Sequence, residues 1–237
     1  MDSDASPAPR FYVLEAGATG SKYDADAFKV DLFNRGPPAT CSACGEPIGM
    51  LTWLPPYRVD LELHGESLGD LVKATGYDLL VSERFAQAFR EEGLKGLEGF
   101  HPVQITKVRQ MRRKTKPSEA PRYLAVTACY GRAALDLARS HIHYVEFPTC
   151  AECRYGSMDA VHELVLEAGT WKGEDIFRPR GLQGTLVVSE RFERFLAKHG
   201  FTNMRLTPTE EYLWNPLARD PALATQGAKT GKDSCSR

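Results

Sequence analysis

Two Cys-x-x-Cys pairs are the residues of this sequence whose types and spacing most directly suggest chemistry. They are Cys41 with Cys44 and Cys150 with Cys153, and they stand 109 residues apart in a chain of 237 residues. Two such pairs can supply four thiolates to one ion, which is a tetrahedral sulfur site that zinc prefers. Four thiolates leave no open coordination position, so such a zinc is structural rather than catalytic. The pattern therefore predicts a zinc staple between two distant parts of the chain.

Three other interpretations of the cysteines stay open. A redox dithiol is one, since a Cys-x-x-Cys pair can lower a thiol pKa, although neither pair follows a strand and opens a clear helix. A second is two separate metal sites, with further ligands among His64, His141, His143 and His162. The third is a vestigial site that no longer binds metal. Outside the pairs, Cys129 is expected to be a small buried apolar residue, and Cys235 a free thiol.

The elements that would position these cysteines repeat along the chain. The pentapeptide Val-Ser-Glu-Arg-Phe occupies residues 81–85 and again residues 188–192, each time after an apolar run. In both copies a glycine follows the serine by 11 positions, so the serine can cap a helix and the glycine can end it. The pentapeptide and the cysteine pairs recur at nearly the same interval, which indicates a tandem duplication.

The predicted fold is α+β, with two related tandem halves that each hold antiparallel strands and a capped helix and share one zinc-knuckle site of four cysteines. We expect a flexible N-terminus at 1–10, a first half at 11–140, a second half at 141–214 and a disordered tail at 215–237. Within the first half, residues 68–74 are expected to form a short helix. Residues 103–108 and 123–130 are expected to form the two strands of a long hairpin.

The tip of that hairpin is basic and is a candidate surface for a partner. Its cations are Lys107, Arg109, Arg112, Arg113, Lys114 and Lys116. Such a tip could bind phosphates or an acidic protein face, whereas the plainer interpretation is a solvated loop that keeps a sheet edge from aggregating. No aromatic side chains are interleaved with the cations, which argues against single-stranded nucleic acid.

Composition and motifs narrow the function class. The formal net charge is −1, with 42% hydrophobic and 26% charged residues, as in a globular protein with no overall bias toward nucleic acid or membrane. No apolar run reaches the length needed to span a bilayer, and the N-terminus lacks the features of a signal peptide, so a cytoplasmic protein is expected. No phosphate-binding glycine loop, nucleophile elbow or His-Glu-x-x-His motif is present. A binding role is therefore favoured over an enzyme.

The sequence resembles the bacterial double-CXXCG motif family over roughly residues 11 to 213. Three features carry this resemblance: the paired cysteines, the repeated helix start and the opening segment Phe11-Tyr12-Val13-Leu14. This resemblance implies an immunity protein of a swarming-inhibition toxin system, which binds a toxin delivered by neighbouring cells and remains in the cytoplasm. One departure is that Arg154 follows the second pair where the family has glycine, which Gly45 supplies after the first.

Two alternative functions come from other classes. A zinc-ribbon protein that binds nucleic acid through the basic tip is the first, and the net charge argues against it because phosphate-driven binding depends on cations. A thiol oxidoreductase is the second. The interpretation taken forward is an immunity protein with structural zinc that neutralises a cognate toxin by stoichiometric binding.

Overall fold

The repeated pentapeptide begins an α-helix at both of its positions. The computed structural model describes residues 8–17, 19–111 and 120–216. In it, α1 spans Glu83–Glu91 and α2 spans Glu190–His199. Ser82 and Ser189 precede them in extended conformation, and each hydroxyl accepts a hydrogen bond from the amide three residues later. The glycines that follow the helices are left-handed, with φ of 64° and 60°, a conformation that glycine adopts without a Cβ clash. The predicted helix starts and ends are thus confirmed.

Strands form most of the remaining regular structure. In chain order they are β1 Phe11–Ala16, β2 Ala25–Lys29, β3 Arg35–Thr40, β4 Pro47–Trp53, β5 Arg58–Leu63, β6 Leu71–Ala74, β7 Leu79–Ser82, β8 Leu97–Pro102, β9 Gln104–Gln110, β10 Tyr123–Ala134, β11 His141–Glu146, β12 Ser157–Glu163, β13 Ile176–Arg180, β14 Leu186–Ser189 and β15 Met204–Pro208, and a 3-10 helix follows at Thr209–Glu211. The fold of the described residues is therefore mixed, with two α-helices and mostly strands.

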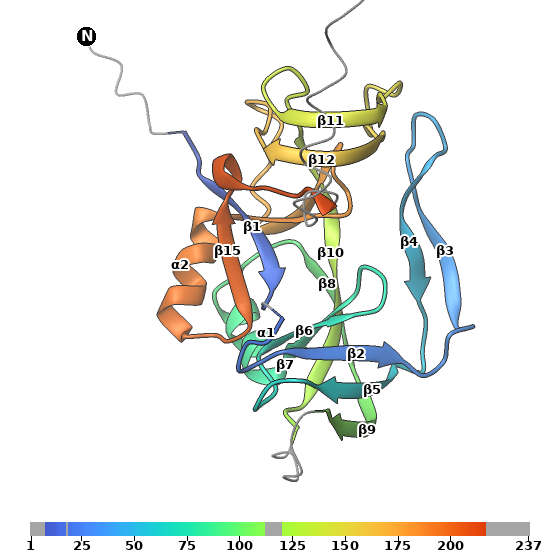
Figure 1. Cartoon of the computed structure of the whole chain (residues 1–237), viewed down its shortest axis with the longest axis vertical. Helices are drawn as coiled ribbons and strands as arrows, with labels where there is room; N and C mark the ends of the chain where they lie inside the picture. Colours follow the sequence, from blue (N-terminus) through green and yellow to red (C-terminus); the bar gives the residue numbers. More distant parts are fainter. Residues whose placement is uncertain (1–7, 18, 112–119, 217–237) are drawn as a thin grey trace, which may run out of the picture.

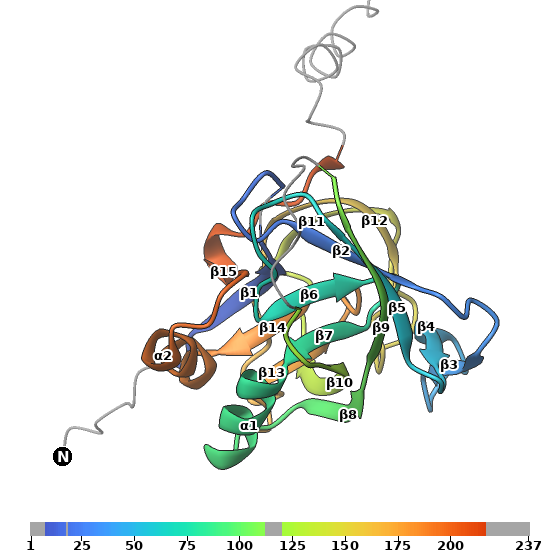
Figure 2. The ribbon, with the colours of Figure 1, turned by 90° about the horizontal axis from the view of Figure 1, so that it is seen from below.

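One 11-stranded sheet dominates the molecule (Figure 1). Its order is β15-β1-β14-β13-β10-β7-β6-β2-β5-β9, and β8 also pairs with β10. Strands β3 and β4 form a hairpin outside this sheet, and β11 and β12 form another. Figure 2 shows the large sheet strongly curled, with both helices beside it.

Two parts of the sheet have the same strand arrangement. One is β8-β10-β7-β6 and the other is β15-β1-β14-β13, and every neighbouring pair within them is antiparallel. The amide of Glu83 bonds the carbonyl of Arg122, just before β10, and the amide of Glu190 bonds the carbonyl of Arg10, just before β1. Strand β1 therefore takes, beside the second helix, the place that β10 takes beside the first. The division of the chain at residue 140 remains a prediction.

The helices pack against each other through phenylalanines. Phe85 and Phe89 of α1 lie 5.5 to 6.5 Å, between ring centroids, from Phe192 and Phe195 of α2. All four rings are buried in one core with residues of β1, β6, β7, β13 and β14. Burying one such side chain contributes roughly 1.5–3 kcal/mol, so this cluster fixes the two copies of the repeat against each other.

Two local predictions were wrong. Residues 71–74 form strand β6 rather than part of a helix, because their backbone pairs with β2 and β7 and three of their four side chains are buried in the cores on the faces of the sheet. The strands β9 and β10 do not form a hairpin: the chain turns at Val103, so β8 pairs with β10 whereas β9 runs parallel to β5. Among the described helices, none has the length and apolar character needed to cross a bilayer.

Candidate metal centre

Each Cys-x-x-Cys pair lies at the turn of a two-stranded hairpin. Cys41 and Cys44 lie between β3 and β4, and Cys150 and Cys153 lie between β11 and β12. The two hairpins approach each other beside the large sheet (Figure 1). This placement explains why 109 intervening residues do not keep the pairs apart, since the sheet returns the chain to the same place.

The four sulfur atoms come together in one cluster, which we call the cysteine cluster. All four Sγ atoms lie within 4.8 Å of one another. The Sγ atoms of Cys41 and Cys150 are 3.9 Å apart, and those of Cys44 and Cys153 are 3.8 Å apart. A tetrahedral zinc with Zn–S bonds of about 2.3 Å separates its sulfurs by about 3.8 Å. The cluster thus has the donor set and the size to hold a metal ion.

The two turns share a backbone geometry although their sequences differ. The amide of Gly45 donates to the carbonyl of Cys41 at 2.9 Å, and the amide of Arg154 donates to the carbonyl of Cys150 at 2.9 Å. Gly45 has a φ of 79° and Arg154 a φ of 52°. Arginine therefore adopts the left-handed conformation that glycine supplies in the first turn, at a cost of about 1–2 kcal/mol.

Contacts of the Arg154 side chain offset that cost. Its guanidinium donates to the carbonyl of Leu135 and forms an ion pair with Glu167. Two further side chains hold the same turn: Gln183 donates to the carbonyl of Cys153 at 2.7 Å, and Arg180 pairs with Glu152 at 3.0 Å. Side-chain contacts therefore hold the second turn in its conformation, whereas in the first turn glycine adopts the left-handed conformation without strain.

The turns also favour thiolates at one cysteine of each pair. Amide groups of Cys44 and Ala43 donate to Cys41 and lower its pKa. The corresponding amides of Cys153 and Glu152 lower the pKa of Cys150 to about 7. Burial raises the pKa of Cys153 to about 12. The first cysteine of each pair therefore adopts the thiolate form, which a metal ion requires, more readily than the second.

The histidines and the fifth described cysteine stand apart from the cluster. In the described ranges, one group of three or more His, Cys, Asp or Glu side chains has donor atoms close enough together to share a metal ion. That group is the cysteine cluster, and it contains no histidine. His141 instead pairs with Glu163 and His143 with Asp159 on the β11–β12 hairpin. Cys129, which was predicted to be buried, is half-buried, and burial raises its pKa to about 11. Cys235 lies outside the described residues.

The basic stretch is only partly described. Lys107 and Arg109 lie exposed on β9, and Arg109 faces Glu62 at 3.3 Å and Asp60 at 4.0 Å. The remaining cations of the stretch, Arg112, Arg113, Lys114 and Lys116, lie outside the described residues. Its role in partner binding remains a prediction.

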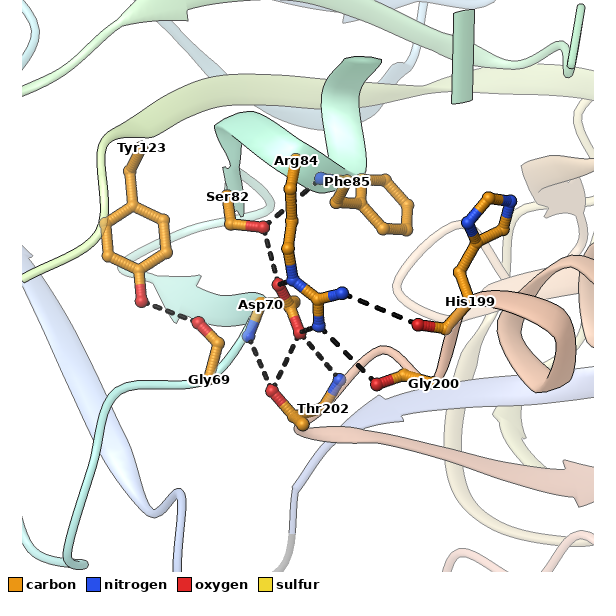
Figure 3. Close-up of polar contacts among 9 residues, drawn as sticks. All are labelled: Gly69, Asp70, Ser82, Arg84, Phe85, Tyr123, His199, Gly200 and Thr202. Atoms are coloured by element: carbon orange, nitrogen blue, oxygen red, sulfur yellow. Dashed lines mark hydrogen bonds and ion pairs between the residues drawn. The ribbon is translucent and has the colours of Figure 1, made fainter. Parts of the chain in front are cut away.

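A buried aspartate lies beside each helix start, which the sequence patterns did not predict, and Figure 3 shows the first of them, Asp70. Asp70 accepts a hydrogen bond from the Ser82 hydroxyl at 2.6 Å, from Arg84, and from the Thr202 amide at 2.8 Å. Burial alone would raise the pKa of Asp70, but its hydrogen bonds from Arg84, Ser82 and Thr202 outweigh burial and lower the pKa. The carboxylate is thus held charged in the protein interior.

The second copy repeats this arrangement. Asp175 accepts from the Ser189 hydroxyl at 2.9 Å, from Arg191 at 3.0 Å and from the Lys95 amide at 2.9 Å. The aspartates precede their serines by 12 and 14 positions. Because these spacings differ, a search for a fixed repeat interval would pass over them. The arginine inside the repeated pentapeptide was the available signal.

Comparison with known proteins adds a family to this geometry. A family model with the description "Immunity protein family (Imm11)" matches residues 53–211. The matched segment contains both helices and the second cysteine pair, and it begins after the first pair. No curated protein matches the chain. The match covers about two thirds of the sequence and confirms the prediction of an immunity protein family. It does not test the double Cys-x-x-Cys motif, because the first pair lies before residue 53.

Proposed function

Because the chain belongs to the Immunity protein family (Imm11), we propose that it protects a bacterial cell by binding a cognate toxin in the cytoplasm. The family match is the observation that carries this proposal. The fold supports it, since two helices locked into one core and two hairpins beside a continuous sheet provide a fixed surface. In this proposal the protein acts by stoichiometric binding and not by turnover.

We propose further that the cysteine cluster holds one structural zinc ion. The ligands are Cys41, Cys44, Cys150 and Cys153, whose Sγ separations suit a tetrahedral ion. Bound zinc would supply four strong bonds between hairpins that are distant in sequence. Its binding free energy would then count toward folding, at about 10–16 kcal/mol apparent in small zinc-finger peptides.

A tandem duplication is the proposed origin of this architecture. It is supported by the repeated pentapeptide, by the shared strand order and by the equivalent contacts of Asp70 and Asp175. In such an origin the metal joins two related hairpins, one from each copy. The basic stretch from Lys107 to Lys116 remains a candidate for the surface that the toxin contacts.

A protection assay tests the proposed function. The chain would be co-expressed in a laboratory bacterium with the toxin domain encoded beside its own gene, and growth would be compared with and without it. Restored growth, together with one-to-one binding of the purified proteins by calorimetry, is expected. A well-folded chain that neither restores growth nor binds that toxin would overturn the proposal.

Nucleic acid binding is tested in parallel with mixed single- and double-stranded DNA and RNA. A phosphate-driven interaction weakens steeply with salt. We expect no salt-dependent binding at protein concentrations that saturate the toxin.

A further inference from the structure

A cleft of about 810 Å³ lies between the large sheet and the two cysteine hairpins. Residues of β1, β6, β7, β13 and β14 line it on the sheet side, and residues of β4 and β12 line it on the hairpin side. The hairpin residues in its wall, 47–50 and 155–158, begin within three positions of the second cysteine of each pair. The position of the cysteine cluster therefore sets the width of the cleft.

The charged side chains of the cleft are not balanced. It is lined by two acids, Glu15 and Asp78, and both already have cationic partners, Arg205 and Lys29 respectively. It is also lined by two cations, Lys73 and Arg178. Neither of these cations forms an ion pair with any residue that the structure describes. With Arg205 and Lys29 counted, four cations stand against two acids in and beside the cleft, a local charge of +2, although the whole chain has a net charge of −1.

Arg178 is a buried cation of the cleft that forms no ion pair with a described residue. Its side chain is buried, and it donates to the backbone carbonyls of Tyr77 at 2.7 Å and Gln183 at 3.2 Å. Its Nε is buried without a hydrogen-bond partner. Buried arginines usually face a carboxylate, because an uncompensated charge in a low-dielectric interior is costly. Arg178 also borders the hollow beside Cys41 and Cys153, so its charge acts on both sites.

The rim of the cleft offers apolar contacts and an unpaired strand edge. Met50, Tyr155 and Trp214 line the cleft and are 53%, 53% and 41% exposed. Strand β4 pairs with β3 on one side and with no other described strand. A free edge of this kind can accept a strand from another protein through main-chain hydrogen bonds. Together these features suit an extended polypeptide that alternates apolar and acidic side chains.

We propose that this cleft receives an extended, acidic segment of the toxin, whose carboxylates lie near Lys73 and Arg178 and whose backbone runs along β4. This inference rests on the proposed function and names the surface that performs it. A nucleic acid is the poorer fit, because a row of phosphates needs a row of cations, and the cleft is lined by two, Lys73 and Arg178. The carboxylates of a polypeptide can be placed singly, opposite the two cations.

A first experiment needs no toxin. The ¹⁵N-labelled full chain is titrated with the peptide Gly-Glu-Leu-Glu-Gly, with its counterpart Gly-Gln-Leu-Gln-Gly, and with inorganic phosphate. The amides of Gly49, Gly76 and Gly184 report on the cleft, and that of Gly169 serves as a distant reference. We expect saturable shifts at the three cleft glycines with the acidic peptide, and binding at least about fivefold weaker with the glutamine peptide. No shifts, equal shifts with both peptides, or shifts reproduced by phosphate alone would overturn the proposal.

A second experiment separates this inference from the proposed function. Lys73→Glu is compared with Lys95→Glu, an equal charge change at an exposed lysine outside both the cleft and the basic stretch. We expect the first to weaken toxin binding about tenfold and the second to change it less than about twofold. If wild type binds the toxin and Lys73→Glu binds as tightly, or if both variants weaken binding equally, the cleft is not the contact surface. If the acidic peptide binds the cleft but the toxin does not bind at all, the cleft is a site for acidic polypeptides, whereas the proposed function fails and with it the toxin as the occupant.

Discussion

Arg84 and Arg191 occupy equivalent positions in α1 and α2, and each reaches the end of the helix that contains the other. Arg84 donates to the carbonyls of His199 and Gly200, both at 3.5 Å, while Arg191 donates to the carbonyls of Gly93, at 3.4 Å, and Glu92. A guanidinium at a helix C-terminus satisfies carbonyls that lack partners within the helix and complements the helix dipole. Each arginine therefore links the start of one helix to the end of the other.

Removing either arginine should destabilise the protein to a similar degree. Arg84→Met and Arg191→Met each leave a buried aspartate without its cation, Asp70 or Asp175. We expect each variant to lose about 1–2 kcal/mol of unfolding free energy, because other hydrogen bonds to the carboxylates remain. Urea unfolding measures the loss. Arg194→Met is the matched control: among the described residues this exposed arginine forms an ion pair with Glu190 alone, one turn away, and its loss should cost under about 0.5 kcal/mol.

Asp70 should make stability depend on acid pH. Its folded pKa lies below its ordinary value of 3.8, so the unfolded chain binds protons first as pH falls. The stabilisation by Asp70 is therefore present above that value and is lost as pH drops through the folded pKa. Asp70→Asn should be less stable at neutral pH and lose less stability between about pH 5 and pH 3. Parallel slopes for variant and wild type in urea unfolding at these pH values would contradict this account.

Losing one cysteine from either pair should abolish binding of the proposed zinc ion. Cys41→Ser and Cys150→Ser are each expected to reduce zinc content from about one equivalent to none. Unfolding free energy should fall by about 4 kcal/mol or more when free zinc is about a thousandfold above its Kd. Elemental analysis and thermal unfolding measure both effects, with Cys129→Ser as the control that keeps the ion. The double variant should be no less stable than either single one, since both remove the same ion.

The two turns should respond differently to a change at the left-handed position. In Arg154→Gly the relief of about 1 kcal/mol of backbone strain offsets the lost ion pair with Glu167. Metal affinity should then stay within about threefold of wild type. Gly45→Val places a β-branched residue at a φ of 79° and should weaken affinity by about tenfold or more. Competition with a chromogenic chelator gives both values, and equal losses in the two variants would refute the shared geometry.

Local features of the fold were predictable because they depend on neighbours in sequence. The serine cap, the apolar face and the terminal glycine of each helix lie within about a dozen residues, and all of them were confirmed. Ligand chemistry predicted that the four cysteines converge, because zinc prefers four donors, but it left separate sites, a redox dithiol and a vestigial site open until the structure brought the four Sγ atoms together. The helix predicted at residues 68–74 was wrong, because tertiary context overrides local propensity in a short apolar segment.

The sequence by itself determined the repeated helices, the four cysteines that converge and the class of protein. Only the tertiary structure decided which strands pair, and it placed β1 beside β14 and β15 rather than beside its neighbours in sequence. It also decided that Asp70 and Arg84 of one copy meet Thr202 and Gly200 of the other. The physical reason is that hydrogen bonds between strands and contacts of buried charges form between segments of any separation. A one-dimensional pattern records which residues can make such contacts and leaves their partners open.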